Sequence, residues 1–209
     1  MKNLILLFTL IISFGMRAEE ATYKITFTGN FDRNSHPVRN FPNNPHFSPP
    51  IVASHNGSYS MFQLGDKATS GVKNVAETGS PVRLLNELSD LQSSAIVKDF
   101  NRSSGLSGNE SISTTITVSK DYPLISFITM IAPSPDWIIG VSGYSLLKEG
   151  EFITERTLPL YAVDAGTDSG LGFLSRNMAT RNPEDIHLLI NVSGLSINQP
   201  FGTLTIEKQ

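Results

Sequence analysis

Alternation between apolar and polar residues is the dominant pattern of this chain. Residues 22–29, TYKITFTG, and 111–119, SISTTITVS, both change character at every second position. The residues that share one face of these segments are Tyr23, Ile25 and Phe27 in the first and Ile112, Thr114, Ile116 and Val118 in the second. A period of two residues is typical of a strand with one buried face. Both segments are therefore predicted to be half-buried strands.

Four further segments extend this all-β pattern. Residues 124–132 and 137–147 are more continuously apolar, as central strands of a sandwich are, and residues 186–194 and 201–208 are predicted to be the last two strands. Six or more strands separated by turn residues favour an antiparallel β-sandwich. The predicted fold class is therefore all-β.

One segment has a helical spacing instead. Residues 80–92, SPVRLLNELSDLQ, carry valine and leucine at intervals of three, with Pro81 at the start and Ser80 as a candidate cap. We expect a short amphipathic helix that covers one end of the sandwich. Residues 30–57, rich in proline, asparagine and histidine, are predicted to be a long loop, and residues 101–111 a flexible segment. Loops this long are often functional.

The first 18 residues form a separate unit. Lys2 precedes an apolar run from Leu4 to Phe14, and Ala18 ends a small-residue exit. This order is typical of a secretory signal peptide, and the run is shorter than the roughly 20 residues that a spanning helix needs. The sequence therefore predicts a signal peptide over 1–18, one domain over 19–209, and a secreted or periplasmic protein.

Composition narrows the classes of function. The net charge of −3 gives no basic surface for nucleic acid. The chain has no cysteine, which excludes disulfides, a thiol nucleophile and a thiolate metal site. An exported domain without disulfides depends on packing, and a bound metal ion is another means of stabilisation.

Three aspartates in small-sided turns are candidate metal ligands. Asp164 and Asp168 flank Ala-Gly-Thr, in which Gly166 permits a positive φ, and Asp136 follows Pro135. Calcium takes six to eight oxygen ligands, and turns can direct carboxylates and backbone carbonyls inward together. Aspartates of this kind also bond their own backbone in ordinary turns. If the three acids converge, their mutual repulsion requires a divalent cation.

Other candidate chemistry is weaker. His36, His46 and His55 have no zinc-site spacing, and we expect them at the surface or in turns. Trp137 opens an apolar strand and is predicted to pack in the core, whereas Phe41 and Phe47 lie in the polar loop and favour an interaction surface. Asp-Ser-Gly at 168–170 matches the tripeptide of aspartic proteases, so an extracellular hydrolase that uses the aspartate loops is the alternative function. No second copy of the tripeptide and no Gly-x-Ser-x-Gly elbow support it.

Several motifs together resemble the spondin domain family, typified by F-spondin and mindin. They are APSPDWIIGV at 132–141 and DAGTDSG at 164–170, supported by HFSPPIVASHN at 46–56, GVKNVAETG at 71–79 and the opening YKITFTGNF. The resemblance implies a β-sandwich similar to calcium-dependent lipid-binding (C-two) domains. It also implies a calcium ion held by Asp136, Asp164 and Asp168, the same three residues that the turns single out.

The resemblance also implies a role. We expect a calcium-binding, non-enzymatic adhesion or recognition module whose partner is a protein or glycan on a cell surface or matrix. Animal members of the family carry cysteines and usually further repeats, so this cysteine-free chain is expected to be a minimal bacterial secreted member. Few basic residues lie near the aspartate turns, which argues against membrane lipid as the partner.

Overall fold

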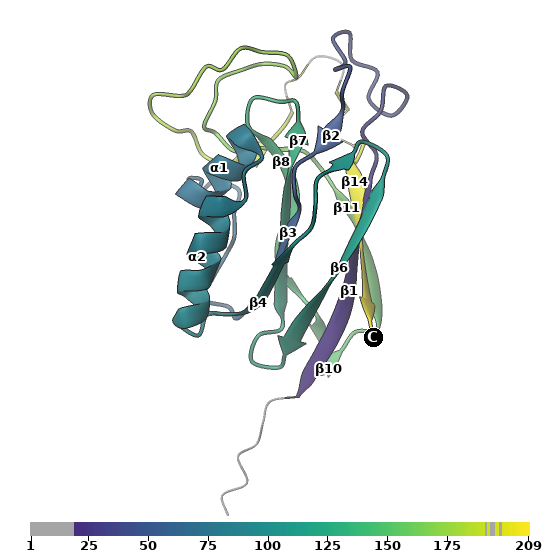
Figure 1. Cartoon of the computed structure of the whole chain (residues 1–209), viewed down its shortest axis with the longest axis vertical. Helices are drawn as coiled ribbons and strands as arrows, with labels where there is room; N and C mark the ends of the chain where they lie inside the picture. The colour runs from purple at the N-terminus through teal and green to yellow at the C-terminus, as the bar shows by residue number, and fades with distance from the viewer. Residues whose placement is uncertain (1–18, 191, 193–194, 197) are drawn as a thin grey trace, which may run out of the picture.

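Two antiparallel sheets face each other and form a sandwich, and two helices cover the outer face of one sheet (Figure 1). This computed structural model describes residues 19–190, 192, 195–196 and 198–209. The predicted signal peptide lies outside the described residues. None of the described helices is long and apolar enough to cross a bilayer.

The smaller sheet has four strands with β1 near its centre. In spatial order they are β11 (Glu155–Leu160), β14 (Gly202–Lys208), β1 (Glu20–Gly29) and β6 (Ser111–Ser119). The side chains of Tyr23, Ile25 and Phe27 point inward and are buried, as their alternation predicts. Residues Ile116 and Val118 of β6 are buried on the same side.

The larger sheet has eight strands. Its main path is β13 (His187–Leu188), β12 (Val163–Asp164), β8 (Trp137–Ser145), β7 (Leu124–Ala132), β2 (His46–Phe47) and β5 (Leu106–Ser107). Two more strands branch from β7: β3 (Ile51–His55) pairs with it, and β4 (Val97–Arg102) pairs with β3. A separate hairpin joins β9 (Leu147–Lys148) and β10 (Glu151–Phe152). The predicted antiparallel β-sandwich is therefore confirmed.

Two hydrophobic clusters hold the three layers together. The first fills the space between the sheets and includes Trp137 and the inward residues of β1. The second lies between the larger sheet and the helices, where Val72 and Val75 of one helix and Leu84 and Leu88 of the other are fully buried. At about 25 cal/mol per Å² of apolar surface, such burial is the main favourable contribution to the stability of the fold.

The helical layer differs from the prediction in one respect. Two helices are present, α1 (Ser70–Thr78) and α2 (Val82–Ser93), where one was expected. The Thr69 hydroxyl caps the first by accepting from Val72 N, and Gly79, with φ 67°, ends it. The prediction of Ser80 as the cap of α2 is wrong. Pro81 lies at the N-cap position, and no side chain caps this helix.

The predicted loop over 30–57 is wrong for its second half. It contains β2 and β3, and every residue of β3 is buried between β4 and β7. The proline-rich flanks hid this strand in the sequence. The segment 101–111 likewise contains β5, paired with β2. The strand expected over 186–194 is reduced to His187–Leu188, and residues 191 and 193–194 lie outside the described part of the chain.

His55 ends β3 inside the protein, not at the surface, which corrects another expectation. Its side chain has no exposed surface, and its Nδ1 donates to the Asn56 carbonyl at 2.8 Å. Its Nε2 accepts from the Ser126 hydroxyl at 2.8 Å, and Ser126 Oγ in turn accepts from Gly143 N. Burial lowers the pKa of His55. This network uses the neutral imidazole.

The contribution of His55 to the free energy of unfolding should therefore fall in mild acid, whereas Asp136, whose folded pKa is raised to about 6, contributes with the opposite sign. Because the folded pKa of His55 is below the unfolded value of about 6.5, the unfolded chain binds the extra proton first. The contribution of His55 to the free energy of unfolding is complete above the unfolded pKa. It is lost as the pH falls below the unfolded pKa, at up to about 1.4 kcal/mol for each pH unit. Urea unfolding at several pH values between neutral pH and mild acid measures the slope of the free energy of unfolding against pH. His55→Gln should reduce the slope, whereas the partly exposed His46→Gln should not; equal slopes in both variants would contradict the assignment.

Candidate metal centre

Asp136 joins the two aspartate turns. It ends the turn between β7 and β8, and its side chain is 0% exposed. Its Oδ2 accepts the backbone N–H of Thr167 at 2.6 Å and of Asp168 at 3.0 Å, and the Thr167 hydroxyl at 3.2 Å. The Asp136 carbonyl also accepts from Ala165 N. Asp136 thus binds the 133–136 turn to the 164–170 turn through its carboxylate and its backbone carbonyl.

The second oxygen of this carboxylate has no partner. Asp136 Oδ1 is buried and makes no hydrogen bond to any described residue. Burial, followed by the charge of Asp164, raises the pKa of Asp136 to about 6. An ionised carboxylate with one unpaired buried oxygen is costly without a cation nearby.

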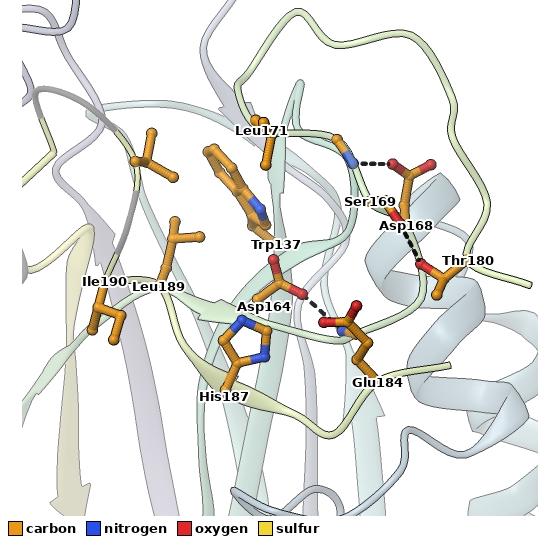
Figure 2. Close-up of a pocket in the computed structure, with 13 residues that line it drawn as sticks. Trp137, Asp164, Asp168, Ser169, Leu171, Thr180, Glu184, His187, Leu189 and Ile190 are labelled. Carbon is orange, nitrogen blue, oxygen red and sulfur yellow. Dashed lines mark hydrogen bonds between the residues drawn. The ribbon is translucent and has the colours of Figure 1, made fainter. Parts of the chain in front are cut away.

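Asp164 faces the same region from β12. Its Oδ1 accepts from Gly166 N at 2.8 Å. The pKa of Asp164 is raised, and burial is the largest cause. The Gly166 N–H, His187 and the Trp137 indole act in the opposite direction and lower this pKa. Trp137 Nε1 forms no hydrogen bond of standard geometry, although Figure 2 places the indole beside the Asp164 carboxylate.

Asp168 directs its carboxylate elsewhere. Its Oδ1 accepts from Gly170 N at 2.8 Å and its Oδ2 from Met178 N at 2.7 Å. The side chain is nearly buried, and its bond to Met178 N closes the 168–178 loop. Asp168 thus meets Asp136 through its backbone N–H and not through its carboxylate.

Gly166 makes the tight curve of this turn possible. Its φ is +71°, as the sequence predicted, and a Cβ at this position would collide with the Glu184 carbonyl oxygen. The Gly166 carbonyl accepts from Glu184 N at 2.7 Å. The aspartate turn and the 184–187 segment therefore lie in direct backbone contact, which only glycine allows here.

The three aspartates fit a cation only in part. Asp136 and Asp164 are electrostatically coupled, and the unpaired Oδ1 of Asp136 is a free oxygen ligand. Over the residues that the structure describes, however, no group of three or more histidine, aspartate or glutamate side chains is arranged to hold a metal ion. The calcium site therefore stays a prediction, supported by two carboxylates and not by an assembled set of three.

Comparison with known proteins gives the family. The Spondin_N family model matches residues 21–206, nearly the whole described chain. This chain belongs to the spondin family. It is 34% identical to Spondin-2 of Rattus norvegicus over 186 residues, which is 84% of this chain and 54% of that protein. It is also 34% identical to Spondin-1 of Gallus gallus over 180 residues, which is 82% of this chain and 22% of that protein. The spondin chain thus spans about half of one relative and about a fifth of the other.

A pocket of about 230 Å³ opens beside the aspartate turns of this spondin domain. Asp164 and Asp168 line it, and Asp136 does not. The other polar side chains of its lining are those of Ser169, Thr180, Glu184 and His187 (Figure 2). Sequence reasoning missed these four residues, although the acidic pair in RNPEDIH was a visible signal. His187 could be placed only by the β12–β13 pairing, which sets it opposite Asp164.

Aromatic residues support the turns from within the sandwich. Phe31 contacts Phe41, Phe47, Phe173 and Phe201 with ring centroids 5.1–6.0 Å apart. Phe41 and Phe47 are buried, so the interaction surface predicted for them is wrong. Trp137 packs on Phe173 at 5.0 Å, which confirms its predicted place in the core.

His36 belongs to the same aromatic cluster. Its ring stacks on Phe201 with centroids 3.8 Å apart, and its Nε2 lies 2.9 Å from the Asn30 carbonyl oxygen. It is buried and not at the surface, which corrects the expectation drawn from the polar loop. We call this cluster the aromatic plug; its members are Phe31, His36, Phe41, Phe47, Phe173 and Phe201. The many polar residues of 30–41 gave no sign in the sequence that this segment contributes to a buried cluster.

Proposed function

We propose that this spondin domain binds one calcium ion at the aspartate turns. The observation that carries the proposal is the buried, unpartnered Oδ1 of Asp136 beside a second carboxylate, Asp164. Each carboxylate is disfavoured as an anion by burial, so a divalent cation would relieve both costs at once. Asp168 is the third proposed ligand; its oxygens already accept backbone N–H groups but keep lone pairs free.

The proposed role of the ion is structural. When bound, it would neutralise the carboxylates of Asp136 and Asp164 and add a contact between the two turns that the hydrogen bonds of Asp136 already join. The loop end would then be held in one arrangement before a partner arrives, which lowers the entropic cost of binding. We propose on this basis a secreted, non-enzymatic recognition or adhesion module for a protein or glycan partner.

The hydrolase alternative is less well supported by the same geometry. Asp136 has no exposed surface, so it cannot contact a substrate. The Asp168 carboxylate, which would be the catalytic group of Asp-Ser-Gly, accepts two backbone N–H groups and supports the loop. Neither carboxylate is placed as a general acid or base towards a bound molecule.

Calcium should raise the melting temperature of the protein. At a calcium concentration 100 times the dissociation constant, the folded state gains about 2.7 kcal/mol, which corresponds to about 5–10 °C for a domain of this size. Differential scanning fluorimetry in calcium and in chelator measures the shift. Asp136→Asn should lose most of it, because the neutral amide is a weak ligand.

The matched control is Asp121→Asn, at an exposed position in the turn before β7. This variant should keep the full calcium shift. No shift in the unaltered protein would refute the proposed metal site, and an equal shift in Asp136→Asn would refute the assignment to this residue. Magnesium in place of calcium tests whether the site prefers the larger ion.

A further inference from the structure

Strand β8 has a free edge. On one side it pairs with β7 along nearly its whole length, from Met130↔Ile138 to Leu124↔Ser145. On the other side it pairs with β12 only at Trp137 and Ile138. Within residues 19–190, no backbone hydrogen bond joins the outer edge of residues 140–145 to another segment. These residues are partly or fully exposed, so their edge is open to an added strand.

A groove of about 350 Å³ follows this free edge. Its floor is formed by Gly140, Val141 and Ser142 of β8. The Ser142 hydroxyl accepts the backbone N–H of Met61 and of Phe62, which fixes one wall against the strand. The other wall is formed by Pro159, Tyr161, Val163 and Leu188. No side chain that lines the groove carries a charge.

Exposed apolar side chains gather on the two walls. Leu64 is 49% exposed and Leu188 is 48% exposed, and Tyr161, at 39% exposed, also lines the groove. Tyr161 and Leu188 also line a second pocket of about 260 Å³, so the apolar surface continues beyond the groove. A contiguous exposed apolar patch of this kind marks an interaction site.

The two chain segments that carry Leu64 and Leu188 hold more negative than positive residues. The segments 63–67 and 184–188, which carry Leu64 and Leu188, hold the acids Asp66, Glu184 and Asp185 and one lysine. That lysine, Lys67, pairs with Asp185 at 2.7 Å. The remaining carboxylates favour a basic partner and oppose an anionic lipid surface.

We propose that this groove binds an extended segment of a partner protein, which adds as an antiparallel strand to β8 at residues 140–145. Backbone hydrogen bonds to the free edge supply affinity, and alternate apolar side chains of the segment fill the space between Leu64, Tyr161 and Leu188. A lysine or arginine near the end of the segment that approaches β12 would lie towards the acidic segments 63–67 and 184–188. This inference rests on the proposed function, because it identifies the surface with which the recognition module binds its partner. The groove contains none of the three proposed calcium ligands.

Selection from a random peptide library tests this surface. The probe is a phage library of peptides of about ten residues, panned on the full chain in calcium, and the enriched peptides are then synthesised. We expect enriched sequences with alternating apolar residues and a basic residue near the C-terminus. Their binding should weaken by about tenfold or more in Leu64→Ser/Leu188→Ser, because two apolar contacts are lost. N-methylation of alternate peptide nitrogens should abolish binding, because it removes the strand donors.

Val82→Ser is the matched control. Val82 is 59% exposed on α2 and lies outside the groove, so this variant should bind the peptides like the unaltered protein. Circular dichroism melts confirm that each variant is folded. The proposal is overturned if no such peptide is enriched, if N-methylated peptides bind equally well, or if the groove variant retains full binding. A membrane surface would be the partner instead if the unaltered protein sedimented with anionic phosphatidylserine vesicles and Leu64→Ser/Leu188→Ser did not.

The calcium arm separates this proposal from the metal site. The selected peptides are titrated again in chelator and with Asp136→Asn. If peptide binding persists when the calcium-dependent rise in melting temperature is lost, the groove is supported and the ion acts only on the stability of the protein. A calcium shift without any peptide binding supports the metal site and refutes the groove.

Discussion

Asp136→Ala is expected to lower the free energy of unfolding by about 3 kcal/mol in chelator, and the melting temperature by about 6–12 °C. The substitution removes the acceptor of three donors, the N–H groups of Thr167 and Asp168 and the Thr167 hydroxyl. These donors stay buried after the change, so each loses its bond to protein and cannot regain one to water. Relief of the unpaired Oδ1 offsets only part of this cost. Urea unfolding followed by circular dichroism measures the loss.

Two controls give this prediction its meaning. Asp121→Ala, at an exposed turn position, should change the free energy of unfolding by less than about 0.5 kcal/mol. Asp136→Asn keeps one acceptor oxygen for the same donors and should cost less than Asp136→Ala. If alanine and asparagine destabilised equally, the bonds to residues 167 and 168 would not be what holds the two turns together.

Phe31→Ala is expected to lower the free energy of unfolding by about 4 kcal/mol. The Phe31 ring is fully buried and makes edge or tilted contacts with four phenylalanines and His36. Alanine would leave a cavity among rings that belong to the core between the two sheets. The measurement is urea unfolding in chelator, so that calcium binding does not contribute.

Phe31→Leu tests whether the effect comes from lost volume. It keeps most of the apolar side chain and should cost about 1–2 kcal/mol. A loss below about 1 kcal/mol for Phe31→Ala would show that the cluster collapses around the gap and that the ring contacts are replaceable. The aromatic plug would then not be a rigid support for the aspartate turns.

Local pattern predicted those parts of the fold that neighbouring residues specify. The alternation in β1 and β6 predicted these strands and their inward faces, because a strand has a fixed period of two. The apolar runs of β7 and β8 predicted central strands without assigning a face. The spacing of leucines gave α2, because a helix repeats about every 3.6 residues. Helix α1 was missed even though Val72, Val75 and Ala76 have helical spacing, because it is short and its cap lies just outside the motif.

The candidate site was predictable as a set of residues but not as a geometry. Small residues around Asp164 and Asp168, and proline before Asp136, mark turns that position carboxylates, and the family resemblance pointed to the same residues. Nothing in the spacing shows that Asp136 bonds the N–H groups of residues 167 and 168, or that Asp168 turns towards Met178 N. The bonds of Asp136 join segments about 30 residues apart and depend on the pairing of β8 with β12, and the bond of Asp168 closes a loop of ten residues.

The sequence by itself determined the strand periods and the family and singled out three aspartates as candidate ligands, because each of these signals is carried by short local motifs. Tertiary structure decided which segments are buried. It placed β3 in the middle of a sheet despite its proline-rich flanks, and it buried Phe41, Phe47, His36 and His55 from an apparently polar loop. It also left the edge of β8 open beside an apolar groove. Burial and free edges are set by packing between distant segments, which no local pattern of residues contains.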